Sequence, residues 1–108
     1  MTSPAYSYTC EAQCPAGFLP AEFTTISTGA LTMDGKFEGA AAVSTKVYFA
    51  PYHADVVGVL DTETNAFDAS ISTGALTMDN KFYGAAAVGT KVYFAPYNSN
   101  VVGVLDTE

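Results

Sequence analysis

The chain has 108 residues, and its 49% apolar content is enough for one small folded domain. Four lysines, no arginine and eleven acidic residues give a formal net charge of −7, which repels phosphate backbones and anionic membrane surfaces. The longest apolar runs are far shorter than the roughly 18 residues that span a bilayer. We therefore expect neither nucleic-acid binding nor membrane insertion.

Residues 1–20 differ in composition from the rest and are expected to form an N-terminal extension. Cys10 and Cys14 are four residues apart, a spacing that brings two cysteines within disulfide reach in a helical turn. We favour a disulfide over free thiols. A zinc site is disfavoured because it needs four ligands and His53 is the only histidine.

From residue 26 to the C-terminus the sequence repeats itself with a period of 45 residues. Aligning 26–63 with 71–108 leaves 32 of 38 positions identical. The six differences are Gly35/Asn80, Glu38/Tyr83, Ser44/Gly89, His53/Asn98, Ala54/Ser99 and Asp55/Asn100. Repeats of this length are typical of solenoids, propellers and arrays, in which each unit buries its faces against its neighbours.

Each repeat is predicted to contain up to four strands. In the second copy, 82–88 is a small-residue strand, 91–95 an aromatic strand, and 101–105 a valine-rich third strand after a loop at 96–100. In the first copy a turn at 61–65 leads into a fourth strand, 67–73, which alone alternates apolar and polar side chains. The other strands are apolar on both faces, so both faces must be covered, as in a β-propeller blade between two neighbours.

The run from Lys91 to Thr107 resembles the surface-layer propeller repeats named for the sequence Tyr-Val-Thr-Asn. That family has a small-residue strand, a Lys-Val-Tyr strand, an Asn-rich turn, a Val-rich strand ending in Asp-Thr, and a Thr-Asn turn, which 61–65 fits. The chain departs from the family at 50–52 and 95–97, where Ala-Pro-Tyr replaces Thr-Asn. The resemblance covers about 80 residues. It implies an extracellular or cell-surface location and carries no catalytic residues.

These patterns predict an all-β chain with two four-stranded β-propeller blades, at 29–73 and 74–108, the second lacking its own outer strand. A closing strand at 21–28, with Phe23, Thr25 and Ile26, is expected to complete a blade of another chain. It matches the fourth strand loosely before Ile26 and closely from it. Identical two-blade chains form even rings, so three chains give six blades and four give eight. The gradient from alanine to tyrosine and phenylalanine along the blade favours the homotrimer over the homotetramer.

Two classes of function remain. The first is a non-enzymatic, self-assembling propeller with a structural or adhesive extracellular role, or an engineered fragment of one. The second is a lectin-like ring that binds carbohydrate through the repeated loops. Aromatic rings beside Asn and Asp suit sugar hydroxyls, although tight loops ordinarily contain the same residues. The candidate ligand-binding residues are Tyr52, His53, Asp55, Tyr97, Asn98 and Asn100.

No enzyme, metal or cofactor is predicted. Asp61, Glu63 and Asn65 have the spacing of the first positions of a calcium loop, but the central glycine and distal glutamate are missing, which favours a turn. The single histidine stands in a variable loop position, where its repeat counterpart is Asn98, so no Ser/His/Asp or Cys/His set is formed.

Overall fold

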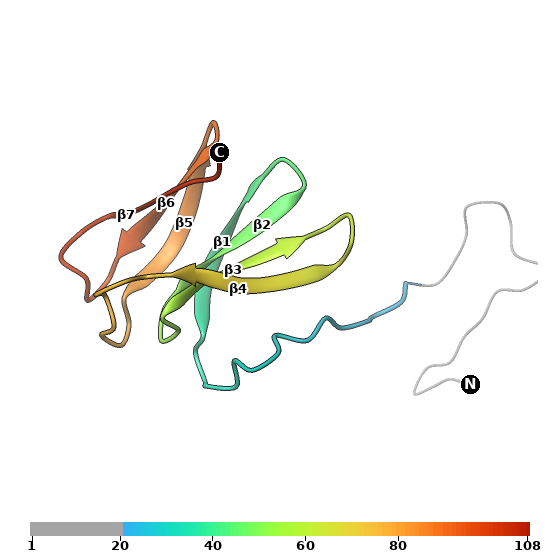
Figure 1. Cartoon of the computed structure of the whole chain (residues 1–108), viewed down its shortest axis with the longest axis horizontal. Helices are drawn as coiled ribbons and strands as arrows, with labels where there is room; N and C mark the ends of the chain where they lie inside the picture. The colour runs from blue at the N-terminus through green and yellow to red at the C-terminus, as the bar shows by residue number, and fades with distance from the viewer. Residues whose placement is uncertain (1–20) are drawn as a thin grey trace, which may run out of the picture.

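The structure is a computed structural model that describes residues 21–108. It contains two antiparallel sheets (Figure 1). Sheet 1 has the order β1 (Phe37–Val43), β2 (Lys46–Pro51), β3 (Val56–Asp61) and β4 (Ala66–Ser72), and sheet 2 has the order β5 (Phe82–Val88), β6 (Lys91–Pro96) and β7 (Gly103–Asp106). The all-β prediction is confirmed for these residues. The predicted extension at 1–20, with its Cys10–Cys14 disulfide, lies outside them.

Residues 21–108 form no helix, so this part of the chain has no helix that could span a bilayer.

The two sheets have the same residue pairing at an offset of 45. Tyr48 pairs with Ala41 on β1 and Val59 on β3, and Tyr93 has the equivalent partners in sheet 2. The first hairpin of each sheet turns at a residue in the left-handed region, Ser44 with φ 56° and Gly89 with φ 61°. Consecutive apolar strands joined by tight turns therefore produce the meander that the sequence indicates.

The third strand of sheet 2 is shorter than predicted. It begins at Gly103 rather than at Val101. Its counterpart β3 begins at Val56, which pairs with Ser72 of the fourth strand. Sheet 2 has no fourth strand among residues 21–108, so the first residues of the predicted strand lack the partner that would hold them extended.

The sheets stack face to face with β1 beside β5 (Figure 1). A Cβ on Gly39 would lie 2.6 Å from the Cα of Gly84, so only glycine permits this approach of the two innermost strands. The larger side chains of Tyr48 on β2 and Phe94 on β6 lie between the sheets beyond this contact. The buried core between the sheets consists of Tyr48, Ala50, Val57, Val59, Phe82, Val92 and Phe94.

Candidate functional site

The outer face of sheet 2 exposes side chains whose repeat counterparts in sheet 1 are buried. The exposed fraction is 6% for Tyr48 and 37% for Tyr93, 5% for Val57 and 56% for Val102, and 9% for Val59 and 58% for Val104. The residue types are identical, so the difference arises from what lies against each face. Sheet 2 covers sheet 1, whereas nothing in the described part of the chain covers sheet 2. We call this surface the uncovered face of sheet 2.

The uncovered face is hollowed as well as apolar. A depression of about 330 Å³ lies along β5 and β6, and Gly84, Tyr93 and Val102 are among the residues that line it. A Cβ on Gly84 would meet no atom within 4 Å, whereas its counterpart Gly39 meets the backbone of β5. The inner strand of sheet 2 thus has open space where the inner strand of sheet 1 has a neighbour.

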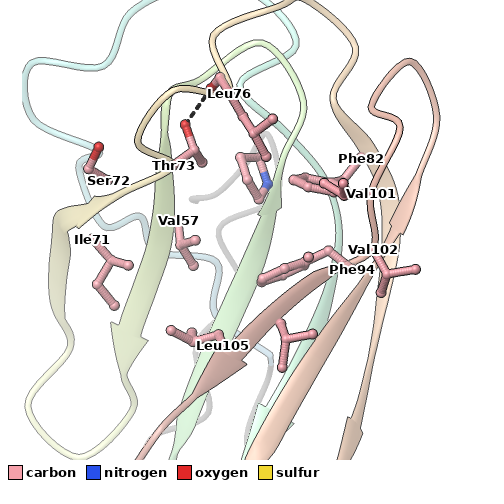
Figure 2. Close-up of a pocket in the computed structure, with 13 residues that line it drawn as sticks. Val57, Ile71, Ser72, Thr73, Leu76, Phe82, Phe94, Val101, Val102 and Leu105 are labelled. Carbon is pink, nitrogen blue, oxygen red and sulfur yellow. Dashed lines mark hydrogen bonds between the residues drawn. The ribbon is translucent and has the colours of Figure 1, made fainter.

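A groove of about 370 Å³ runs between β4 and sheet 2, and we call it the large groove (Figure 2). Ile71 enters it from β4, and Phe82, Phe94 and Leu105 line it from sheet 2. Its lining is largely apolar, with Thr73 at one end, where the Oγ1 hydroxyl donates a hydrogen bond to the Leu76 carbonyl at 2.7 Å.

A smaller groove of about 150 Å³ occupies the equivalent place on sheet 1, and we call it the small groove. The residues that line it are Ile26, Thr28, Phe37, Phe49, Leu60 and Phe67. The first five are the repeat counterparts of Ile71, Thr73, Phe82, Phe94 and Leu105 in the large groove. Phe67 of β4 has no counterpart, because sheet 2 lacks a fourth strand within residues 21–108.

The segment before β1 repeats the local structure that follows β4. Thr28 Oγ1 donates to the Leu31 carbonyl at 3.0 Å, as Thr73 Oγ1 does to the Leu76 carbonyl. The Gly29 N–H donates to Ser27 Oγ at 2.9 Å, a bond that Gly74 and Ser72 also form at 2.9 Å.

The predicted closing residues Phe23, Thr25 and Ile26 form no strand in the single chain, and Phe23 is 92% exposed. Their predicted partner is another chain, so the closing role stays a prediction.

The two loops considered for carbohydrate binding lie beside each other at the boundary between the sheets. The rings of Tyr52 and Tyr97 have centroids 6.3 Å apart, and Tyr83 of β5 lies 6.1 Å from the first and 5.7 Å from the second. Desolvation raises the pKa of Tyr52 above its usual value of 10.0, with smaller contributions from Tyr97, Glu38 and Tyr83. Tyr83 is absent from the residues predicted for this site, although the Glu38/Tyr83 difference between the repeats was a signal for it.

Asp55 is held in an ion pair between the two sheets. Its Oδ1 atom lies 2.7 Å from Nζ of Lys81, whose side chain is fully buried. The same ammonium group donates to the His53 carbonyl at 3.4 Å. Lys81 was also not singled out from the sequence, because only the stacking of the sheets buries it.

Of the remaining candidate residues, His53 is half-buried and Asn98 is exposed. His53 Nδ1 lies 3.6 Å from Asp79 Oδ1, and Asn98 Nδ2 donates to the Asp79 carbonyl at 3.3 Å. Asn100 is exposed. Five of the six candidate residues, all but Asn100, therefore lie near the boundary between the sheets, and none of the six lines the large groove, the small groove or the depression.

The segment with calcium-loop spacing forms a hydrogen-bonded turn. The Glu63 N–H donates to Asp61 Oδ1 at 2.9 Å, and the Asn65 N–H donates to the Asp61 carbonyl at 2.7 Å. Asn65 has φ 60°, which asparagine tolerates. Within residues 21–108 no group of three or more His, Cys, Asp or Glu side chains is placed to hold a metal ion.

No protein-family model, curated protein or solved structure matches the chain.

Proposed function

We propose that the chain is a non-enzymatic building block of a β-propeller, in which each sheet is one blade and several copies of the chain close the ring. The observation that carries this proposal is the unequal exposure of identical side chains on sheets 1 and 2. Sheet 2 buries an apolar face of sheet 1, so the identical face of sheet 2 should be buried by a further sheet.

Sheet 1 of a second copy has the surface that fits. Within one chain, Phe82, Val92 and Phe94 of sheet 2 pack against sheet 1. The identical residues Phe37, Val47 and Phe49 of sheet 1 are only partly buried in the single chain. The two ends of the chain are thus complementary, and contact between copies would repeat the contact within a copy.

A ring of two-blade chains has an even number of blades, so three copies give six and four give eight. We favour the homotrimer, because the glycine contact holds β1 and β5 close together while the larger Tyr48 and Phe94 lie between the neighbouring strands β2 and β6. Residues 21–28 of each copy would complete sheet 2 of its neighbour. The resemblance to Tyr-Val-Thr-Asn propeller repeats supports a structural or adhesive role outside the cell.

Native mass spectrometry of the full chain tests this proposal, with Val102→Asp as the disruptive variant. A charge on the uncovered face should prevent its burial between copies and leave monomers. Thr64→Asp is the matched control, because Thr64 is exposed in the turn before β4, where Oγ1 accepts from the Ala66 N–H at 3.3 Å and an aspartate can do the same. The unmodified chain and the control should both be trimers. A stable monomer of the unmodified chain would contradict the proposal.

A second candidate function is carbohydrate binding by the ring. It is supported by the cluster of Tyr52, Tyr83 and Tyr97, in which the last two rings are exposed. Such rings can stack on sugar faces. A glycan array tests this function, with Tyr97→Ala as the variant that should lose binding while keeping the oligomer. An array without hits would leave the structural role alone.

A further inference from the structure

We infer that Phe23 of a second copy fills the large groove, and that the strand around it pairs with β7 one residue out of step with the repeat alignment. This inference rests on the proposed assembly and names the contact that closes it. Three observations carry it: an incomplete phenylalanine cluster, an irregularity in β4, and the spacing of Phe23 and Ile26.

The small groove contains a cluster of three phenylalanine rings. The centroids of Phe37 and Phe49 are 5.7 Å apart, and Phe67 of β4 lies 6.2 Å from the first and 6.5 Å from the second. In sheet 2 the counterparts Phe82 and Phe94 are 5.8 Å apart and have no third ring among residues 21–108. The large groove, more than twice the volume of the small one, lies at that place. A third aromatic ring from a fourth strand is what this groove lacks.

The pairing of β4 with β3 contains a register shift. Val57 pairs with Ile71 and Leu60 with Phe67, so four steps along β4 match three steps along β3. An extra residue of this kind is a β-bulge. The bulge places Phe67 toward the small groove and Ile71 toward the large groove, on opposite sides of the sheet.

The closing strand also contains a phenylalanine followed by an isoleucine, but the two are one residue closer in sequence than Phe67 and Ile71 of β4. Phe23 and Ile26 are three positions apart, so in a regular strand their side chains point to opposite faces without any bulge. If Ile26 pairs with Val102, as Ile71 pairs with Val57, then Phe23 stands opposite Leu105, as Phe67 stands opposite Leu60. The third ring then enters the large groove.

The alternative register, taken from the 45-residue alignment, is less favourable. It places Glu22 at the position that Phe67 occupies in sheet 1. It places Phe23 at the position of the exposed Asp68. A carboxylate would enter an apolar groove while a phenyl ring remained in water. The bulge-free register instead sets Glu22 opposite Asp106, a like-charge pair between two exposed residues at the strand end, where solvent and salt weaken the repulsion.

Disulfide trapping distinguishes the two registers. With Cys10 and Cys14 replaced by serine, we pair Val104→Cys with either Thr24→Cys or Phe23→Cys. In the bulge-free register the residue opposite Val104 is Thr24, and in the repeat register it is Phe23. Directly opposed residues of antiparallel strands have Cβ atoms close enough for a disulfide. After mild oxidation, the Thr24→Cys pair should give covalent oligomers on a non-reducing gel and the Phe23→Cys pair should not.

The outcomes separate the inference from the proposed function. Efficient trapping through Phe23→Cys would overturn the register while leaving the assembly standing. Absence of trapping in both pairs, with oligomers still seen by native mass spectrometry, would overturn the closing strand. Monomers throughout, including the unmodified chain, would overturn the assembly itself.

A second measurement tests whether the phenyl side chain of Phe23 fills the large groove, whatever the register of the strand. In the otherwise unmodified chain, Phe23→Ala should raise the dissociation constant of the oligomer by about tenfold or more, and Phe23→Leu should restore much of the affinity because it refills the groove. Equal affinity of the unmodified chain and the alanine variant would place Phe23 outside the contact.

Discussion

The imidazole ring of His53 occupies the space that a side chain on Gly35 would need. A Cβ built on Gly35 would lie 2.7 Å from His53 Cδ2, while the His53 N–H donates to the Gly35 carbonyl at 3.0 Å. In the second repeat the same backbone bond joins Asn98 and Asn80 at 2.9 Å. Gly35 and Asn80 have nearly the same φ, 58° and 59°. Two of the six repeat differences therefore form one coupled change.

This coupling predicts the behaviour of a double-mutant cycle. Gly35→Asn alone should lower the free energy of unfolding by about 1–2 kcal/mol, because the new Cβ overlaps the imidazole ring. Adding His53→Asn should recover most of this loss, since the pair then matches the second repeat. Denaturant unfolding of the two single variants and the double variant measures the coupling energy. Strictly additive effects would show that the two positions are independent.

The buried ammonium of Lys81 predicts a cost for removing its carboxylate partner. Asp55→Asn should lower the free energy of unfolding by about 1–3 kcal/mol, because the carboxylate that neutralises the buried ammonium group is replaced by a neutral amide. Thermal unfolding measures this change. Asp34→Asn is the control, since Asp34 is exposed on the segment before β1. Equal melting temperatures for the two variants would contradict a stabilising ion pair.

Lys36 is the repeat counterpart of Lys81, and it should face a different partner in the contact between copies. In the proposed ring, the repeat counterpart of the Lys81–Asp55 pair is Lys36 of one copy and Asn100 of the next. Asn100→Asp should therefore tighten the contact between copies and lower its dissociation constant by about tenfold. Dilution followed by native mass spectrometry measures this effect. No change in dissociation would mean that Lys36 does not meet this loop in the assembly.

The first hairpin contains a backbone conformation that its residue does not favour. Ser44 has φ 56°, and the equivalent Gly89 has φ 61°. Ser44→Gly should raise the free energy of unfolding by about 0.5–1 kcal/mol, because glycine removes the Cβ penalty in the left-handed region. Gly89→Ser should lower it by a similar amount. Melting temperatures that move the other way would rule out strain at this turn.

The tyrosine cluster predicts a loss of stability at alkaline pH. The pKa of Tyr52 is raised in the folded chain, so the folded state keeps a proton that the unfolded state has released. The stabilising contribution is complete below pH 10.0, the ordinary pKa of tyrosine, and is lost as pH rises through the higher folded-state pKa. Tyr52→Phe should flatten this dependence. Ultraviolet titration of tyrosinate and alkaline unfolding curves test it, and identical curves for the two proteins would contradict it.

The sequence predicts the strands well where their apolar character and turns are local properties. The repeated Gly-Ala, Tyr-Phe and Val-rich runs mark β1, β2 and β3, and the tight turns between them fix the meander. It fails where a neighbour decides the outcome. Val101 and Val102 have the same residue types as Val56 and Val57, yet they lie outside β7 because no strand in the described chain pairs with them.

The candidate site shows the same division. Tyr52 and Tyr97 were identified because they recur in loops, but Tyr83 and Lys81 acquire their roles only when one sheet stacks on the other. Nothing in the residues around Lys81 alone indicates that its ammonium group is buried against a loop of the preceding repeat. Pairings across the sheet boundary depend on packing that local patterns do not encode.

In the proposed assembly, the contact between Gly39 and Gly84 should limit the number of copies that close a ring. No side chain separates the inner strands at this point, and a Cβ on Gly39 would force them apart. The angle between successive sheets then depends on the strands further from this contact, where the rings of Tyr48 of β2 and Phe94 of β6 lie in the core between the sheets. Changing ring volume there should alter the rotation from one sheet to the next. A rotation that does not divide a full circle would leave the last copy unable to meet the first, and growth would continue as a filament.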